Sequence, residues 1–211
     1  MYRSTAVLTV GAGLPARQLT AISGRVVPVP DPDRLVHLQF RRFAGCPVCN
    51  LHLQSLVRRY EAIDQAGVRE VVVFHSPADE LRRHVSTLPF DVVADPEQRL
   101  YADFGVAPSP RALLHPRVWA AILLALPRST AAIARGRERA PAARPHGGRL
   151  GLPADFLITS DGRIAAAKYG EHAYDQWSVD ELLQKAARTL RSADPPAVSK
   201  VEAPSSTTPR H

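Results

Sequence analysis

The feature that most constrains this chain is a pair of cysteines, Cys46 and Cys49, placed where an apolar strand pattern gives way to an amphipathic helix pattern. The strand pattern covers residues 35–40, and the helix pattern begins at Pro47, which suits a first helical position because it has no N–H to lose. At such a junction the first sulfur lies at the helix N-terminus, where unpaired N–H groups and the helix dipole favour the thiolate. The pattern therefore predicts Cys46 as the nucleophile. Cys49, one turn further on, is placed so that a disulfide can form.

Three other uses of the cysteine pair can be weighed. A structural zinc site normally takes four protein ligands, and the chain has no second Cys pair; His52 is the one near neighbour that could contribute. Covalent haem attachment needs His directly after the second Cys, and that residue is Asn50. Two buried structural cysteines remain an alternative, although the order of strand, Gly45, Cys46 and Pro is expected to expose the first sulfur. We expect neither a metal nor an organic cofactor.

The size and cysteine content of the chain predict its general class. A chain of 211 residues can bury a sizeable core without disulfides, and two closely spaced cysteines suggest redox chemistry in a reducing compartment. The short apolar run over residues 5–14 is interrupted by glycines and does not predict a signal peptide. No stretch has the length of a membrane span. We therefore expect a cytoplasmic protein.

The net charge of +7 is concentrated in one segment. Residues 111–150 hold a single acid, Glu138, and eight arginines, so this segment accounts for the whole excess. The rest of the chain is neutral in sum, which excludes a general basic face and gives no reason to expect a nucleic-acid partner. The arginines are Arg111, Arg117, Arg128, Arg135, Arg137, Arg139, Arg144 and Arg149.

The remaining patterns predict an α/β chain in which strands and helices alternate. Apolar runs predict strands over 6–10, 18–22, 25–29, 35–40, 69–74, 91–94, 112–114, 154–159 and 163–169. Helical spacing and capping residues predict helices over 47–65, 77–86, 96–105, 117–135 and 178–191. This order is that of a thioredoxin-like fold, a mixed central sheet flanked by helices, with an N-terminal β-hairpin extension and a helical insert. We expect one domain over 1–191, an insert at about 115–150 and a disordered tail over 192–211.

The predicted insert has an apolar face made by Trp119, Ile122, Leu123 and Leu126, followed by Pro127. An ordinary helix that packs this face on the domain explains the pattern. The more specific alternative is that this helix is a lid or dimer contact that controls access to Cys46. In that case the arginines of the segment would attract an acidic substrate or partner.

From about Gly13 to Arg188 the sequence resembles the peroxiredoxin-like proteins of the AhpC/TSA-related group, which include the selenoprotein L and prostaglandin F synthase-like branches. The motifs that carry this resemblance are RRFAGCPVC (41–49), VVVFHS (71–76), DPEQRLY (95–101), GLPADFLI (151–158) and DQWS (175–178). The resemblance implies a thioredoxin fold, Cys46 in the peroxidatic position and Cys49 in the resolving position. It further implies a thiol-dependent peroxidase that an external dithiol, thioredoxin-like or glutathione-like, regenerates.

The chain departs from the family pattern at one point. Typical peroxiredoxins carry Pro-x-x-x-Thr-x-x-Cys, and the matching positions here are Gln39 and Phe43. The activity of a general thiol-disulfide oxidoreductase is therefore a second predicted function. A redox-sensing binding module that uses the basic 111–150 segment is a third.

Several residues are candidates to support Cys46. Arg41, Arg42 and Arg111 are candidates to hold the thiolate, although an arginine is more often a surface residue. His75 follows a predicted buried strand and could tune Cys46. Pro153 precedes a strand and resembles the cis-proline that faces the Cys pair in thioredoxin-like folds. Trp119 and Trp177 are expected to be core or interface aromatics.

Overall fold

The computed structural model describes residues 7–85, 87–107, 109, 122–123, 126–127, 130–131, 133–136 and 144–193. The predicted strand 112–114, Arg111, Trp119 and the tail from 194 onward lie outside these residues, so the division into domain, insert and tail stays a prediction. Within the described part, no helix is long and apolar enough to cross a membrane.

A five-stranded mixed sheet forms the centre of the molecule, in the order β5-β4-β3-β6-β7. The strands are β3 (Leu35–Arg41), β4 (Val68–Phe74), β5 (Asp91–Ala94), β6 (Ala154–Ile158) and β7 (Ile164–Tyr169). β3, β4 and β5 are parallel, and β6 pairs antiparallel with both β3 and β7. All seven residues of β3 are buried, as expected for the central strand of a sheet covered on both faces.

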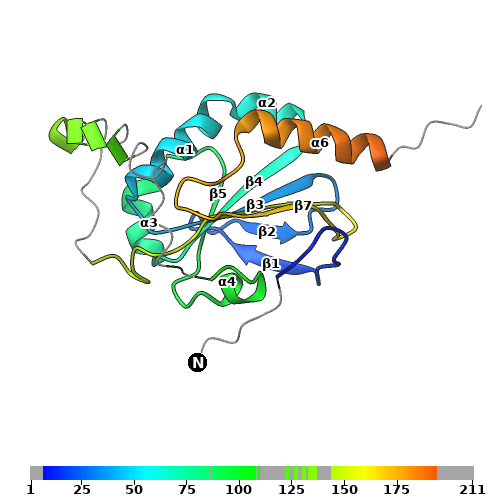
Figure 1. The fold of residues 1–211 in the computed structure, drawn as a ribbon, viewed down its shortest axis with the longest axis horizontal. Coiled ribbons are helices and arrows are strands. Elements are labelled where there is room, and N and C mark those ends of the chain that lie inside the picture. Colours follow the sequence, from blue (N-terminus) through cyan, green and yellow to red (C-terminus); the bar gives the residue numbers. More distant parts are fainter. Residues whose placement is uncertain are drawn as a thin grey trace, which may run out of the picture.

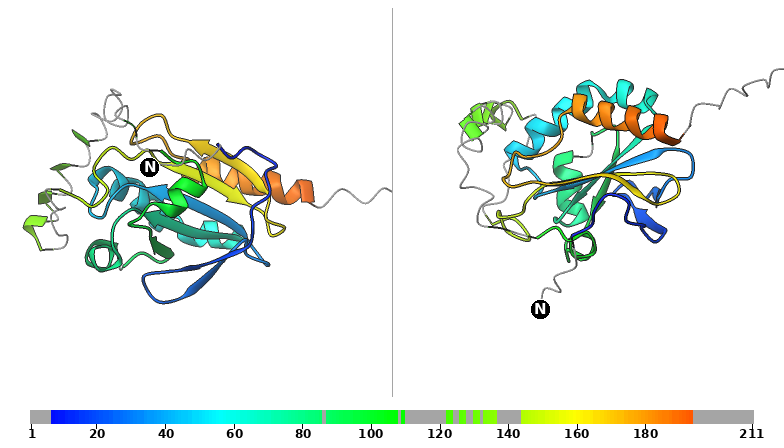
Figure 2. Two further views of the ribbon diagram at one scale, coloured as in Figure 1. Left: turned by 90° about the horizontal axis from the view of Figure 1, so that it is seen from below. Right: turned by 45° about the vertical axis from the view of Figure 1, so that its right-hand side comes forward.

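Helices and a small hairpin cover the two faces of this sheet (Figure 1). Two helices, α1 (Pro47–Arg58) and α2 (Tyr60–Gln65), lie with α6 (Val179–Ala193) over one face, and α3 (Ala78–Val85) packs into the same apolar layer. On the other face lie α4 (Arg99–Asp103) and the antiparallel pair β1 (Arg17–Thr20) and β2 (Val26–Val29). Figure 2 shows the same layers from two further sides. The predicted thioredoxin-like architecture with its N-terminal hairpin is confirmed.

Side chains alternate along β3 between two different environments. Val36, Leu38 and Phe40 enter the apolar cluster on the hairpin side. Alternate strand positions point to opposite faces, so His37, Gln39 and Arg41 must point toward the α1 side. All three are buried, which places polar groups where a strand normally contributes apolar ones.

Most predicted elements are present, and three differ for local reasons. The predicted helix 47–65 is divided at Arg59, whose φ of −116° is not helical and whose N–H bonds to Leu56 O three residues back. The helix expected from 96 begins at Arg99, because the Asp95 carboxylate accepts the N–H groups of Arg99, Leu100 and Tyr101. Residues 7–10 form no strand, although one was predicted over 6–10.

The predicted capping box at the start of α6 is confirmed. Ser178 Oγ accepts the N–H of Glu181 at 3.2 Å, and Glu181 Oε2 accepts the N–H of Ser178 at 2.7 Å. These two bonds satisfy donors that the first turn would otherwise leave unpaired.

Candidate active site

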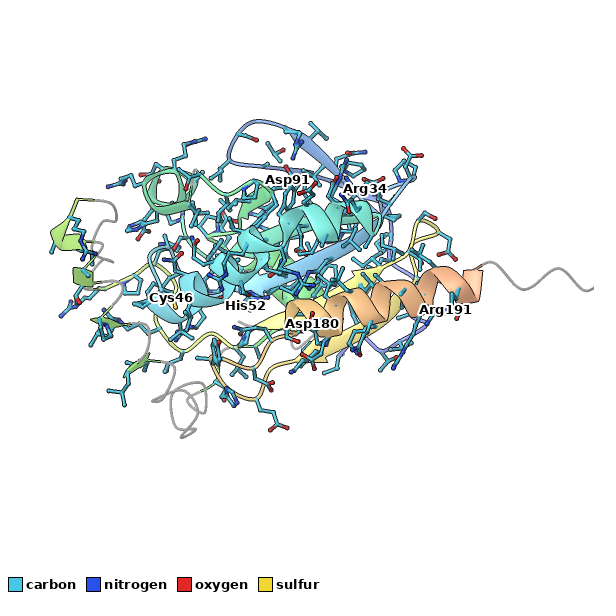
Figure 3. The ribbon with its side chains drawn as sticks, turned by 90° about the horizontal axis from the view of Figure 1, so that it is seen from above. Arg34, Cys46, His52, Asp91, Asp180 and Arg191 are labelled. Carbon is cyan, nitrogen blue, oxygen red and sulfur yellow. The ribbon has the colours of Figure 1, made fainter. Side chains whose placement is uncertain are left out.

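The Cys46–Cys49 pair lies at the N-terminal end of α1, as the sequence pattern predicted. Cys46 is the N-cap of the helix, Pro47 occupies its first turn, and Cys46 Sγ accepts the N–H of Cys49 at 3.4 Å. Figure 3 shows Cys46 at this end of α1 and His52 further along the helix. Both cysteines are free thiols, and their side chains hydrogen-bond to each other.

Arg42 is the arginine that contacts the nucleophile. Its Nη2 donates to Cys46 Sγ at 2.9 Å, and its Nη1 donates to Arg149 O at 3.1 Å. Arg41 and Arg42 are only 1% and 4% exposed, so neither is a surface arginine. Burial tends to lower the pKa of Arg42, but Cys46 and Cys49 raise it above its usual value, which keeps the guanidinium charged.

The two thiols act as one titrating pair. The hydrogen bond from Cys46 lowers the pKa of Cys49 to about 5, against the effect of burial and with help from Arg42. Burial, and then the same hydrogen bond, raise the pKa of Cys46. The pair therefore loses one proton readily and keeps the second. Cys46 keeps the two features that favour a thiolate there, the helix N-terminus and the Arg42 guanidinium.

The first sulfur is buried rather than exposed. Cys46 is 2% exposed and forms a small apolar cluster with Phe43, Val48 and Cys49, against which Ile122 of the predicted insert packs. The predicted exposure is wrong because these side chains, and not the local backbone order, decide access to the sulfur. Of the expected apolar face of the insert, Leu123 and Leu126 are exposed.

His75 lies directly after β4 and contacts a short strap, residues 145–151, that also contacts Arg42. Its Nδ1 lies 2.9 Å from His146 O, and its ring makes an edge contact with Tyr101. Burial lowers the pKa of His75, and the charge of Arg42 adds to this effect. Gly147 has a left-handed φ of 71°, and a methyl group there would lie 2.5 Å from His75 Nδ1, so the glycine allows the strap to pack on the ring.

The two remaining predicted site residues are Arg111 and Pro153. Arg111 lies outside the described residues. Pro153 precedes β6 as expected, but the cis peptide bond of the described chain is Val29–Pro30, so the Leu152–Pro153 bond is trans. The likeness to the cis-proline of thioredoxin-like folds is therefore wrong in this respect.

A fully buried polar network lies beneath α1, and the sequence analysis did not predict it. Arg41 Nη2 donates to Asp155 Oδ1 and to Gln39 Oε1, both at 2.6 Å, and lies 3.2 Å from His52 Nε2. Because a guanidinium has no acceptor, His52 Nε2 must accept this hydrogen bond. Burial, and then Arg41, hold the pKa of His52 well below its ordinary value, so the ring is neutral. His52 is thus a partner of Arg41. Among the described residues, no three or more His, Cys, Asp or Glu side chains are arranged so that they could hold a metal ion.

His37 connects this polar network to residues of β4 and β6. Its Nδ1 lies 2.9 Å from Glu70 Oε2 and its Nε2 lies 3.3 Å from Asp155 Oδ1. Asp155 Oδ2 accepts the N–H of Trp177, whose ring stacks on His37. The one sequence signal for this network is the run of polar residues at alternate positions of a strand that is otherwise apolar.

Comparisons with known proteins agree with this geometry. The family model described as AhpC/TSA antioxidant enzyme matches residues 55–172, more than half of the chain, in a range that begins after the cysteine pair. A search of proteins with curated descriptions found no match.

Solved structures of peroxiredoxin-like and thioredoxin-like proteins share the fold. The peroxidoxin BcpB from Mycobacterium tuberculosis matches with 15% identity and a TM-score of 0.57, over 88% of this chain and 98% of its own. A peroxiredoxin-like protein from Aquifex aeolicus matches with 15% identity and a TM-score of 0.59, over 88% and 90%. A putative thiol:disulfide interchange protein DsbE from Chlorobium tepidum matches with 17% identity and a TM-score of 0.53, over 86% and 97%. These likenesses show the thioredoxin-like fold and, with the family match, support a thiol oxidoreductase. The family match shows that the chain belongs to the AhpC/TSA antioxidant enzyme family.

Proposed function

We propose that this protein is a peroxiredoxin-like thiol peroxidase, in the selenoprotein L and prostaglandin F synthase-like branch of its family. The observation that supports this most is the contact of the Arg42 guanidinium with Cys46 Sγ at the N-terminus of α1. A fixed positive charge and helix N–H groups stabilise both a thiolate and the sulfenate that a peroxide would make from it.

The cycle begins with proton transfer inside the cysteine pair. Cys49 takes the proton of Cys46 through their hydrogen bond, which leaves the Cys46 thiolate facing Arg42. The thiolate attacks the terminal peroxide oxygen; the S–O bond forms, the O–O bond breaks, and the leaving oxygen departs as an alcohol or water after it gains a proton. Cys49 then attacks the sulfenic acid, releasing water and forming the Cys46–Cys49 disulfide. An external dithiol reduces this disulfide and restores both thiols.

The burial of Cys46 favours a small oxidant. A protein disulfide can reach the sulfur only if Phe43 and Ile122 move away, whereas a hydroperoxide needs much less room. The second candidate, a general thiol-disulfide oxidoreductase, is favoured by Phe43 at the position where peroxiredoxins carry the peroxide-binding Thr. A redox-sensing module that uses the basic 111–150 segment would keep the Cys pair but show no turnover.

The partners proposed here follow from the chemistry of the pair. They are a small peroxide or disulfide as oxidant and a thioredoxin-like dithiol or glutathione-like thiol as reductant. A homodimer and a monomer are both compatible with this cycle. The cytoplasm is the proposed location, because a reducing compartment keeps both thiols available.

The deciding experiment compares peroxide consumption with disulfide reduction by the same purified protein, each with a supplied dithiol. Arg42→Met should lower the rate of peroxide consumption by about 100-fold, since it removes the charge on the thiolate and sulfenate. Arg58→Met on the exposed side of α1 is the matched control and should leave the rate unchanged. Peroxide consumption that is absent in the wild type, together with rapid disulfide reduction, would favour the oxidoreductase; no turnover in either assay would favour the sensor.

A further inference from the structure

The predicted insert and the strap leave apolar side chains uncovered. Ile122 packs against the Cys46 cluster, but Leu123 beside it is 71% exposed and Leu126 is 50% exposed. Leu150 of the strap is 42% exposed. A single exposed leucine is common on a protein surface, whereas several at one end of a molecule indicate a surface that contacts a partner.

These leucines lie at one end of the molecule. In Figures 1 and 2 the described pieces of residues 122–136 lie beyond α1 and α3, away from the C-terminal end of α6. Figure 3 shows Cys46 toward this end and Arg191 at the other. The strap reaches the same region, because Arg149 O accepts a hydrogen bond from Arg42 beside Cys46. The uncovered leucines therefore belong to the end that carries the active site.

The same stretch of chain is strongly basic. By sequence, residues 111–150 hold eight arginines and one acid, while the rest of the chain is neutral in sum. Three of these arginines lie in the described part, and all three are exposed: Arg135, Arg144 and Arg149. Exposed leucines and exposed arginines thus occur together on one segment. This combination is typical of segments that lie in the interface of a membrane.

Three kinds of partner can be compared for this segment. A second copy of the chain would bring the same positive charge to the contact, which opposes association through it. A nucleic acid would pair with the arginines but leave the leucines without an apolar partner. An anionic lipid surface matches both, because its headgroups attract the arginines and its acyl region receives the leucine side chains.

We propose that this end of the molecule is a docking surface for an anionic lipid membrane, formed by Leu123, Leu126, Arg135, Arg144 and Leu150. The protein lies on the bilayer through this surface and does not span it. Docking brings the end that carries Cys46 to the bilayer. The proposal concerns binding alone, so it holds or fails independently of the proposed peroxidase function.

Co-sedimentation of the full-length protein with lipid vesicles tests this proposal. Two kinds of vesicle are compared, phosphatidylcholine alone and an equal mixture of phosphatidylcholine and phosphatidylglycerol, each at low and at physiological salt. Leu123→Ser/Leu126→Ser removes apolar side chains from the docking surface, and Arg135→Gln/Arg144→Gln removes two of its charges. Circular dichroism verifies an intact fold for each variant.

Two matched controls make the same kinds of change elsewhere. Val26→Ser/Leu190→Ser replaces apolar residues that are 57% and 46% exposed, one in β2 and one in the last turn of α6. Arg58→Gln/Arg191→Gln removes two exposed arginines outside the docking surface, so the net charge falls by the same amount.

We expect the wild type to bind the mixed vesicles, more weakly at physiological salt, and not to bind phosphatidylcholine alone. The arginine variant should bind about 20-fold more weakly, since each arginine near an anionic surface contributes about fivefold. The leucine variant should bind about 10-fold more weakly, because it loses two apolar side chains that the bilayer would bury. Both controls should bind within about twofold of the wild type.

Absence of binding to the mixed vesicles would overturn the proposal, and binding to polyglutamate in its place would identify an acidic protein as the kind of partner. A leucine variant that binds as well as the wild type would also overturn it, because charge alone would then explain the contact. The same holds for equal binding to both kinds of vesicle or equal losses in the controls. None of these measurements involves peroxide consumption, so the proposed function is tested separately.

Discussion

Raising the pH should weaken the fold through His37. Both ring nitrogens face carboxylates, Glu70 at 2.9 Å and Asp155 at 3.3 Å, so a neutral ring would turn one lone pair toward a carboxylate oxygen. Burial alone lowers the pKa of His37, but Glu70 and Asp155 together raise it from 6.5 to about 9. Because the folded pKa exceeds the unfolded one, this stabilisation is complete below 6.5 and is lost as the pH rises through 9. The expected loss in unfolding free energy from about pH 7 to about pH 9.5 is about 2–3 kcal/mol.

The cysteine pair works in the opposite direction and must be removed to see this effect. The pKa of Cys49 is lowered to about 5 in the folded protein, so its contribution grows as the pH rises toward the pKa of an unfolded thiol. The Cys46→Ser/Cys49→Ser double variant eliminates that contribution. His52 and His75 do not interfere, because their lowered pKa values leave them neutral in both states above about pH 7.

Urea unfolding followed by circular dichroism, repeated across this pH range, measures the effect. The double-serine variant should lose stability steadily, while the reduced wild type should show a flatter profile. His37→Asn in the double-serine background is the control; it should be less stable at neutral pH and show no such slope. A double-serine variant whose stability stays level or rises over this range would refute the conclusion that His37 is held in its charged form.

Three further predictions concern other parts of the molecule. Cys49→Ser should accumulate sulfenic or overoxidised Cys46, or an intermolecular dimer, after mild peroxide, because the chain has no third cysteine to resolve the sulfenate; mass spectrometry that finds the same products as in the wild type would exclude Cys49 as the resolving residue. Phe40→Ala should lower the unfolding free energy by about 3–5 kcal/mol, since the ring is fully buried against Tyr101, Phe104 and Phe156, whereas Val26→Ala at an exposed position should have little effect in the same denaturation assay. Deleting residues 117–143, which keeps His146 and Gly147 in place, should speed alkylation of Cys46 because Ile122 no longer covers its cluster; unchanged labelling in a folded deletion variant would mean that the segment does not control access.

Local features of the site could be predicted from the sequence because neighbouring residues determine them. The strand that ends near Arg41, the Pro at the start of the helix and the spacing of the two cysteines place Cys46 at a helix N-terminus whatever surrounds it. The capping box of the last helix and the alternation of strands and helices are local in the same sense. These features, together with the motif resemblance, were enough for the fold and the identity of the cysteines.

The surroundings of the cysteines depended on contacts between distant parts of the chain. Arg41 and Arg42 are adjacent in sequence, yet one enters the network with Asp155, 114 positions away, and the other contacts Cys46 and the strap residue Arg149. His37 and Asp155 meet across 118 positions because β6 pairs with β3 in the assembled sheet. Burial of Cys46 and the raised pKa of His37 both follow from such packing, which residue spacing does not encode. The tertiary structure alone decides them, because the electrostatic environment of a side chain is set by whatever the folded chain places around it.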